Sequence, residues 1–126
     1  MKSVICALVI FILIITMIVF SCIYTENVVG EILQSLYKNE NHVAKNNWET
    51  AVDRGEYISF LWNKHRKVTV TLFNHTIIER VDESIAKMNI ALKMQKKDEF
   101  FYESSNLDLL LKSLLEQQKV SVGNVF

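Results

Sequence analysis

The amino-acid sequence predicts an all-α protein, with an N-terminal transmembrane helix followed by an up-down bundle of three to four helices. The stretch from Val4 to Tyr24 carries no charged residue and matches the roughly 20 apolar residues that cross a bilayer as one helix. Proline is absent and glycine occurs only three times, so little interrupts helices in the rest of the chain. There, apolar residues recur at steps of three and four, which is the period of an amphipathic helix.

The apolar stretch divides the chain into a membrane anchor, residues 1–24, and a helical bundle domain, residues 25–126. Only Lys2 and the amino terminus place positive charge before the stretch, whereas the acidic Glu26 and Glu31 follow it. The positive-inside rule then predicts a single-pass protein of the cell membrane, with a cytoplasmic N-terminus and an extracytoplasmic bundle. The anchor is expected to be an uncleaved signal-anchor.

Two processed forms of the anchor stay open. A secretory signal peptide has a shorter apolar core and a cleavage site of the Ala-x-Ala type, which this stretch lacks. Residues 19–22, Val-Phe-Ser-Cys, loosely resemble a bacterial lipobox, in which Cys22 would be lipidated. Either form keeps the bundle outside the cytoplasm. Cys22 cannot form a disulfide with Cys6, because about 24 Å of helix separates them.

Spacing and capping residues divide the rest of the chain into helices. The first, Glu26 to Lys45, continues from the anchor, and Asn47 is placed to cap a second helix that extends to Leu72. Residues 67–73 contain the β-branched run Val-Thr-Val-Thr, in which apolar and polar side chains alternate. This pattern would also suit a strand, but no second strand is available to pair with it. We therefore expect helix there.

The third helix begins at a capping box, Thr76 to Glu79, in which the two side chains satisfy each other's free backbone amides. Asp98 is expected to cap the fourth helix, which ends at residues 117–119. The apolar residues 120–126 are expected to lie back across the bundle, because burying their side chains is favourable. Helix starts near residues 47 and 97 also suggest a faint repeat of about 50 residues.

The order of these features resembles a known family. The motifs are one basic residue before an isoleucine-rich anchor, Asn-Trp-Glu-Thr-Ala at 47–51, Trp62 followed by cations at 64–67, Leu-Phe-Asn-His at 72–75, and the ending Gly-Asn-Val-Phe. Together they are similar to a bacterial domain-of-unknown-function family of short, membrane-anchored helical proteins from Gram-positive bacteria. The resemblance implies a location and a fold, but no activity for any residue.

The sequence predicts no catalytic residue, no cofactor and no metal site. The histidines at 42, 65 and 75 are not spaced three or four apart, as a helix requires to present a metal pair. There is no Gly-rich phosphate loop, no Gly-x-Ser-x-Gly and no cysteine outside the anchor. A formal net charge of zero also speaks against nucleic-acid binding, and no small-molecule substrate is evident.

Five residues form the predicted interaction face. Trp48 and Trp62 lie about four helical turns apart and so share one stripe, for which core packing is the leading interpretation and a peptide-binding groove the alternative. Lys64, Arg66 and Lys67 form a short cationic run that could contact anionic lipid or wall polymer.

We therefore expect a non-enzymatic interaction or accessory subunit that holds a protein partner, or a second copy of itself, at the outer face of the membrane. One alternative is a structural coiled-coil component of a cell-envelope assembly, which needs a continuous heptad seam from residue 26 onward. Another is a lipoprotein-like ligand-binding or hydrolytic domain, which needs a polar pocket. The sequence identifies neither the partner nor the oligomeric state.

Overall fold

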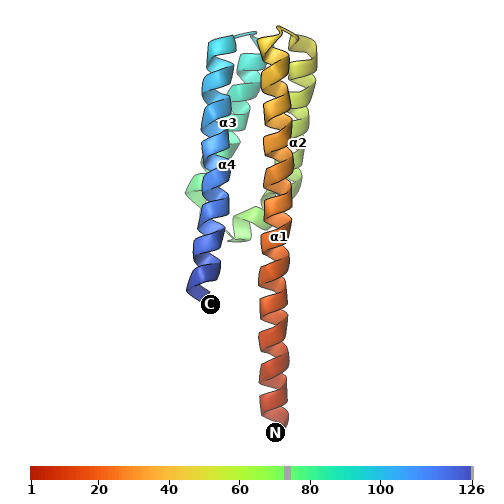
Figure 1. Ribbon diagram of the computed structural model, residues 1–126, viewed down its shortest axis with the longest axis vertical. Coiled ribbons are helices and arrows are strands. Elements are labelled where there is room, and N and C mark those ends of the chain that lie inside the picture. Colours follow the sequence, from red (N-terminus) through yellow and green to blue (C-terminus); the bar gives the residue numbers. More distant parts are fainter. Residues whose placement is uncertain (73–74, 126) are drawn as a thin grey trace.

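The chain folds, in this computed structural model, into four α-helices: α1 (Lys2–Ala44), α2 (Trp48–Leu72), α3 (His75–Lys93) and α4 (Lys97–Val125). The structure describes the backbone of residues 1–72 and 75–125 and the side chains of residues 1–67 and 75–119. Each helix packs against the next, and α4 also packs against α1, so the helices close into an up-down bundle (Figure 1). The predicted all-α fold is confirmed, and the described residues contain no strand.

Helix α1 is much longer than the bundle it belongs to. It has 43 residues, and its N-terminal part projects alone beyond the other three helices (Figure 1). It also runs without a break through the boundary between residues 24 and 25. By length and composition, α1 is long and apolar enough to cross a membrane. None of its most apolar 18-residue stretch is buried inside the protein.

Apolar residues from all four helices form one core. Among the described side chains, the apolar residues that are at most 2% exposed are Val29, Ile32, Leu36, Val43, Ala51, Ile58, Trp62, Ile78, Val81, Met88, Ala91, Leu92, Phe100, Leu107, Leu111 and Leu114. They recur at helical spacing on the inward stripe of each helix, as the sequence pattern predicts. Fully burying one such side chain contributes about 1.5–3 kcal/mol, so this core is what holds the bundle together.

Polar side chains inside the core tie α1 to its two neighbours. Asn39 of α1 is fully buried and donates from Nδ2 to the backbone carbonyl of Ala51 in α2 at 3.1 Å. Ser104 of α4 donates to Oε1 of Glu40 in α1 at 2.6 Å. Buried polar groups need such partners, so these bonds favour one register of α1 against both neighbours.

The two turns at the end of the bundle far from the N-terminus have the same geometry. Asn46 follows α1 with φ 61° and Gln95 follows α3 with φ 54°, and both lie in the left-handed region. The amide of Asn47 donates to the carbonyl of His42, and the amide of Asn46 donates to that of Val43. This is the Schellman pattern, and the amides of residues 96 and 95 repeat it with the carbonyls of residues 91 and 92.

The matched turns belong to an internal repeat of 49 residues. Buried positions in the α1–α2 hairpin correspond, 49 residues later, to buried positions in the α3–α4 hairpin: Ile32 with Val81, Leu36 with Ile85, Val43 with Leu92, Ile58 with Leu107, and Trp62 with Leu111. The repeat of about 50 residues suggested by the sequence is therefore a repeat of two packed hairpins.

Three predicted boundaries are corrected. Helix α4 continues to Val125 and does not end at residues 117–119, so the backbone of 120–125 extends the helix and does not turn back across the bundle. The propensity cost of Gly123, about 1 kcal/mol, is too small to end a helix by itself. Helix α3 begins at His75, which places Thr76 inside it, and α4 begins at Lys97, which places Asp98 in its first turn.

The strand alternative is wrong for residues 67–72, because α2 extends as helix to Leu72. The second helix was expected to close at Asn74 and His75. Asn74 lies outside the described residues, and His75 is the first residue of α3.

Candidate interaction surfaces

The structure separates the two tryptophans of the predicted interaction face. Trp48 is half-buried at the start of α2, where it packs against the core. Trp62 is only 2% exposed. Its indole ring is thus part of the core, as the leading interpretation held, and is not available to a partner in this conformation.

Asp82 of α3 holds the buried indole of Trp62 in place. The Nε1–H of Trp62 donates to Oδ1 of Asp82 at 2.5 Å, and Nε of Arg66 donates to Oδ2 of the same carboxylate at 2.9 Å. A buried indole N–H needs an acceptor, and Asp82 provides it. Asp82 therefore has a structural role next to Trp62 and Arg66 of the predicted face. Sequence reasoning missed it, because its role depends on how α3 is rotated against α2.

A second polar contact links the lower part of α2 to α1. The hydroxyl of Tyr24 hydrogen-bonds to Nδ1 of His65, and the two rings meet edge to face with their centroids 5.0 Å apart. Burial lowers the pKa of His65, and the charge of Lys64 lowers it further, while Glu31 acts in the opposite direction. The contact fixes which residues of α1 and α2 stand at the same level.

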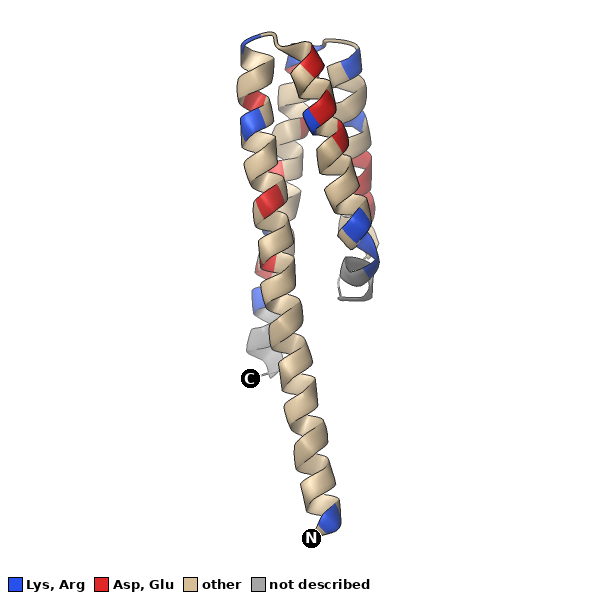
Figure 2. Cartoon of the chain, turned by 90° about the vertical axis from the view of Figure 1, so that its right-hand side faces the viewer, with Lys and Arg blue, Asp and Glu red and all other residues tan. Residues whose placement is uncertain are grey.

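The cations of the predicted face lie near the anchor side of the bundle. Lys64 and Lys67 are exposed, and Arg66 is partly covered by its ion pair with Asp82. Figure 2 shows that Lys, Arg, Asp and Glu occur along the bundle, whereas the projecting part of α1 is free of them until its N-terminal end. The structure brings the cations together with Trp62 but leaves Trp48 at the other end of α2.

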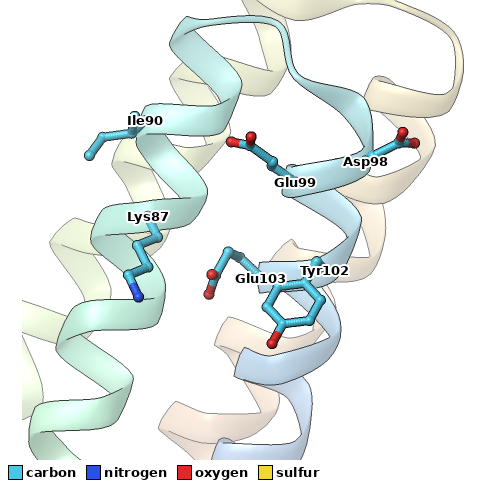
Figure 3. Close-up of a pocket in the computed structure, with 6 residues that line it drawn as sticks. All are labelled: Lys87, Ile90, Asp98, Glu99, Tyr102 and Glu103. Carbon is cyan, nitrogen blue, oxygen red and sulfur yellow. The ribbon is translucent and has the colours of Figure 1, made fainter.

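A surface hollow of about 350 Å³ lies between α3 and α4 near the far end of the bundle. Figure 3 shows the amine of Lys87 on α3 at the level of the Glu103 carboxylate on α4, whereas the carboxylate of Glu99 lies higher, near the level of Ile90. Ile90 and Tyr102 border it and are 56% and 73% exposed. An exposed apolar pair with a charged rim is the composition of a small protein-interaction surface.

Lys87 is the cation among the residues that line this hollow. Lys87 forms an ion pair with Glu83 at 2.8 Å, and this hydrogen bond raises the pKa of Lys87. A catalytic lysine requires a lowered pKa so that its amine is free. Lys87 has the opposite environment, so it can supply charge and a hydrogen-bond donor.

Metal-binding and cofactor-binding residues were not expected, and the described part of the chain contains no group of three His, Cys, Asp or Glu side chains that could hold a metal ion.

A further hollow of about 300 Å³ lies beside the apolar part of α1, where Cys22 and Glu26 of α1 face Leu115, Gln118 and Lys119 of α4.

A comparison with models of protein families gives a match that covers nearly the same residues as the packed helices. A family model described as "Domain of unknown function (DUF4363)" matches residues 19–125. The chain belongs to the DUF4363 family. The match begins inside the apolar part of α1 and ends at the last residue of α4, so the family unit includes the end of the apolar stretch and the whole bundle. No curated protein and no solved structure matches the chain significantly.

Proposed function

We propose that this DUF4363 protein is a single-pass membrane protein without enzymatic activity, whose bundle binds a protein partner at the outer face of the cell membrane. One observation carries the proposal. The apolar part of α1 is exposed along its length, although the rest of the protein has a well-packed core. Leaving about twenty apolar residues in water is strongly unfavourable, so this part of α1 needs a bilayer around it.

The orientation is supported by the distribution of charge around α1. Lys2 is the only cationic side chain before the apolar stretch, and the acidic Glu26 and Glu31 follow it. Positively charged flanks stay in the cytoplasm, so the bundle is placed outside. The N-terminal anchor then fixes the bundle at the membrane, which raises its effective concentration for a membrane-bound partner.

The hollow bordered by Ile90 and Tyr102 is our candidate for the contact with that partner. It lies toward the end of the bundle away from the anchor, where a partner can approach without meeting the membrane. The cationic residues Lys64 and Lys67 lie at the opposite end and are better placed to face lipid headgroups.

The coiled-coil alternative receives less support. Its seam would use the apolar residues that follow residue 26, but Val28, Val29, Ile32 and Leu36 are already buried against the other helices of the same chain. A ligand-binding domain would need an enclosed polar pocket. The hollows between α3 and α4 and between α1 and α4 are open to the surface, and so is one along α2 at Thr50 to Tyr57.

Site-specific photo-cross-linking in intact cells tests the proposal. A photoreactive phenylalanine replaces Tyr102 in one variant and the exposed Gln34 of α1 in a control variant. We expect position 102 to give one discrete cross-linked product, heavier than the chain by the mass of a single partner protein. Position 34 is expected to give much less of any product. An adduct of twice the mass of the chain would favour self-association. Only monomer at position 102 would contradict the proposed contact.

A further inference from the structure

The contact between Tyr24 and His65 shows how far the bundle reaches down the anchor. Tyr24 is the last residue of the apolar stretch, and α2 runs antiparallel to α1 beside it. Helix α2 continues for seven residues beyond His65, to Leu72. At 1.5 Å per residue these residues extend about 10 Å past Tyr24 toward the N-terminus of α1.

Helix α4 passes the same level. Lys119 shares a hollow with Cys22 and Glu26 of α1, so it stands close to the end of the apolar stretch. Helix α4 then continues for six residues to Val125, which is about 9 Å. Figure 1 shows the end of α2, the start of α3 and the end of α4 at the height of the part of α1 that precedes the bundle core.

Charged residues stop within about two helical turns of this level in every helix. Below Glu26, α1 carries no Asp, Glu, Lys or Arg until Lys2. The α2–α3 hairpin carries none between Lys67 and Glu79, and α4 carries none after Lys119. Glu79 lies nearly one turn closer to the hairpin than Asp82, which pairs with Arg66, so Glu79 and Lys67 stand at similar heights. The upper edge of the uncharged zone therefore lies within about two helical turns, roughly 10 Å, in all four helices.

We propose that the lipid bilayer surrounds this whole zone, so that the α2–α3 hairpin and the end of α4 are embedded in the interface of the outer leaflet together with α1. This inference rests on the proposed membrane anchor but not on any protein partner. The bundle is then set into the membrane surface and does not stand above it on a single helix.

The dimensions agree with this arrangement. Residues 4–24 span about 31 Å as a helix, close to the roughly 30 Å hydrocarbon thickness. Keeping that stretch in lipid draws the neighbouring helix ends about 10 Å inward, which is the depth that interfacial segments reach.

The side-chain chemistry at the two helix ends suits that depth. Residues 68–78 combine valine, leucine, isoleucine and phenylalanine with threonine, asparagine and one histidine, His75, and residues 120–126 combine valine and phenylalanine with serine, glycine and asparagine. Just above, the exposed cations Lys64, Lys67 and Lys119 can reach lipid phosphates while their aliphatic stems lie along apolar surface.

Depth-dependent fluorescence quenching tests the proposal on the full-length chain. Cys6 and Cys22 are first replaced by alanine, and single cysteines are then introduced by Ser121→Cys and Thr71→Cys at the two helix ends. Ser105→Cys in α4 and Thr50→Cys in α2 are matched controls far from the anchor, and Leu13→Cys reports the anchor itself. Each variant carries an environment-sensitive fluorophore and is reconstituted into vesicles of phosphatidylcholine and phosphatidylglycerol containing acyl-chain nitroxide lipid.

We expect the nitroxide lipid to remove about half or more of the emission at positions 71 and 121, as for a label 5–10 Å deep, and little at positions 50 and 105. Equal, weak quenching at all four positions would overturn the inference. A blue-shifted but unquenched label at 71 and 121 would also overturn it, because protein and not lipid would then cover these ends. If one of these two outcomes is found together with strong quenching at position 13, the membrane anchor is supported and only this inference is wrong. Weak quenching at position 13 would show that the proposed anchor itself is wrong.

Discussion

Gly55 and Gly30 both lie inside helices, but adding a Cβ atom is expected to have opposite effects on stability at the two positions. A Cβ atom added at Gly55 of α2 would lie 2.3 Å from Oδ1 of Asn89 and 2.7 Å from Cδ1 of Leu92 in α3. A Cβ atom at Gly30 of α1 would meet nothing within 4 Å. Gly55 therefore permits the close approach of α2 and α3, whereas Gly30 only costs conformational entropy.

We expect Gly55→Ala to lower the free energy of unfolding by about 1–3 kcal/mol, as overpacking does, and Gly30→Ala to raise it by about 0.5–1 kcal/mol. Thermal unfolding of the full-length protein in detergent, followed by circular dichroism, measures both. A Gly55→Ala protein as stable as the Gly30→Ala protein would show that α2 and α3 are not in close contact.

His65 gives the bundle a predictable response to acid. Its pKa in the folded protein is lowered from 6.5, first by burial and then by the charge of Lys64. The unfolded state therefore binds a proton more readily. The stabilisation contributed by neutral His65 is complete above the unfolded pKa and is lost as the pH falls through the lower folded pKa.

Replacing the imidazole removes this response. We expect the melting temperature of the wild-type protein to fall between about pH 7.5 and about pH 5.5 by more than that of His65→Asn. Melting curves of both proteins at the two pH values provide the measurement. An identical decrease in both would mean that His65 contributes nothing to the acid sensitivity.

At the scale of the elements, the two Schellman turns set the far end of the bundle, and both use a residue other than glycine in the left-handed region. Asparagine tolerates this conformation better than glutamine, so the turn at Gln95 carries more backbone strain than the turn at Asn46.

We expect Gln95→Gly to stabilise the protein by about 1 kcal/mol and Asn46→Gly by less. Met94→Gly is the matched control, since Met94 is exposed and is not among the residues with positive φ. Chemical denaturation of the three variants compares them directly. Destabilisation by Gln95→Gly would show that the chain does not adopt this turn.

Spacing alone predicted the helices but not all of their ends. The start of α2 after Asn47 follows from a local pattern, because the break and the next apolar stripe adjoin in the sequence. The extension of α4 to Val125 did not, because residues 120–126 contain Gly123 and β-branched valines, which are weak helix formers and give no clear signal for or against a continued helix. The hydrogen bond between Trp62 and Asp82 depends on helix rotation, which periodicity does not define.

At the scale of the whole molecule, the anchor and the bundle share one continuous helix. Since α1 passes from the apolar stretch into the core without a break, the bundle cannot reorient freely against the anchor unless α1 bends. Gly30 is the position where the helix is weakest by propensity, and it lies above the contact between Tyr24 and His65. A partner bound to the bundle would thus be held at a defined height above the membrane.

The most direct test of this account is the sidedness of the chain in intact cells. With Cys6 and Cys22 replaced by alanine, Ser3→Cys and Ser105→Cys place matched single cysteines before the apolar stretch and in α4. The account predicts that a membrane-impermeant maleimide labels position 105 in intact cells and position 3 only after permeabilisation. Labelling of both positions in intact cells, or of position 3 alone, would contradict a single crossing with the bundle outside.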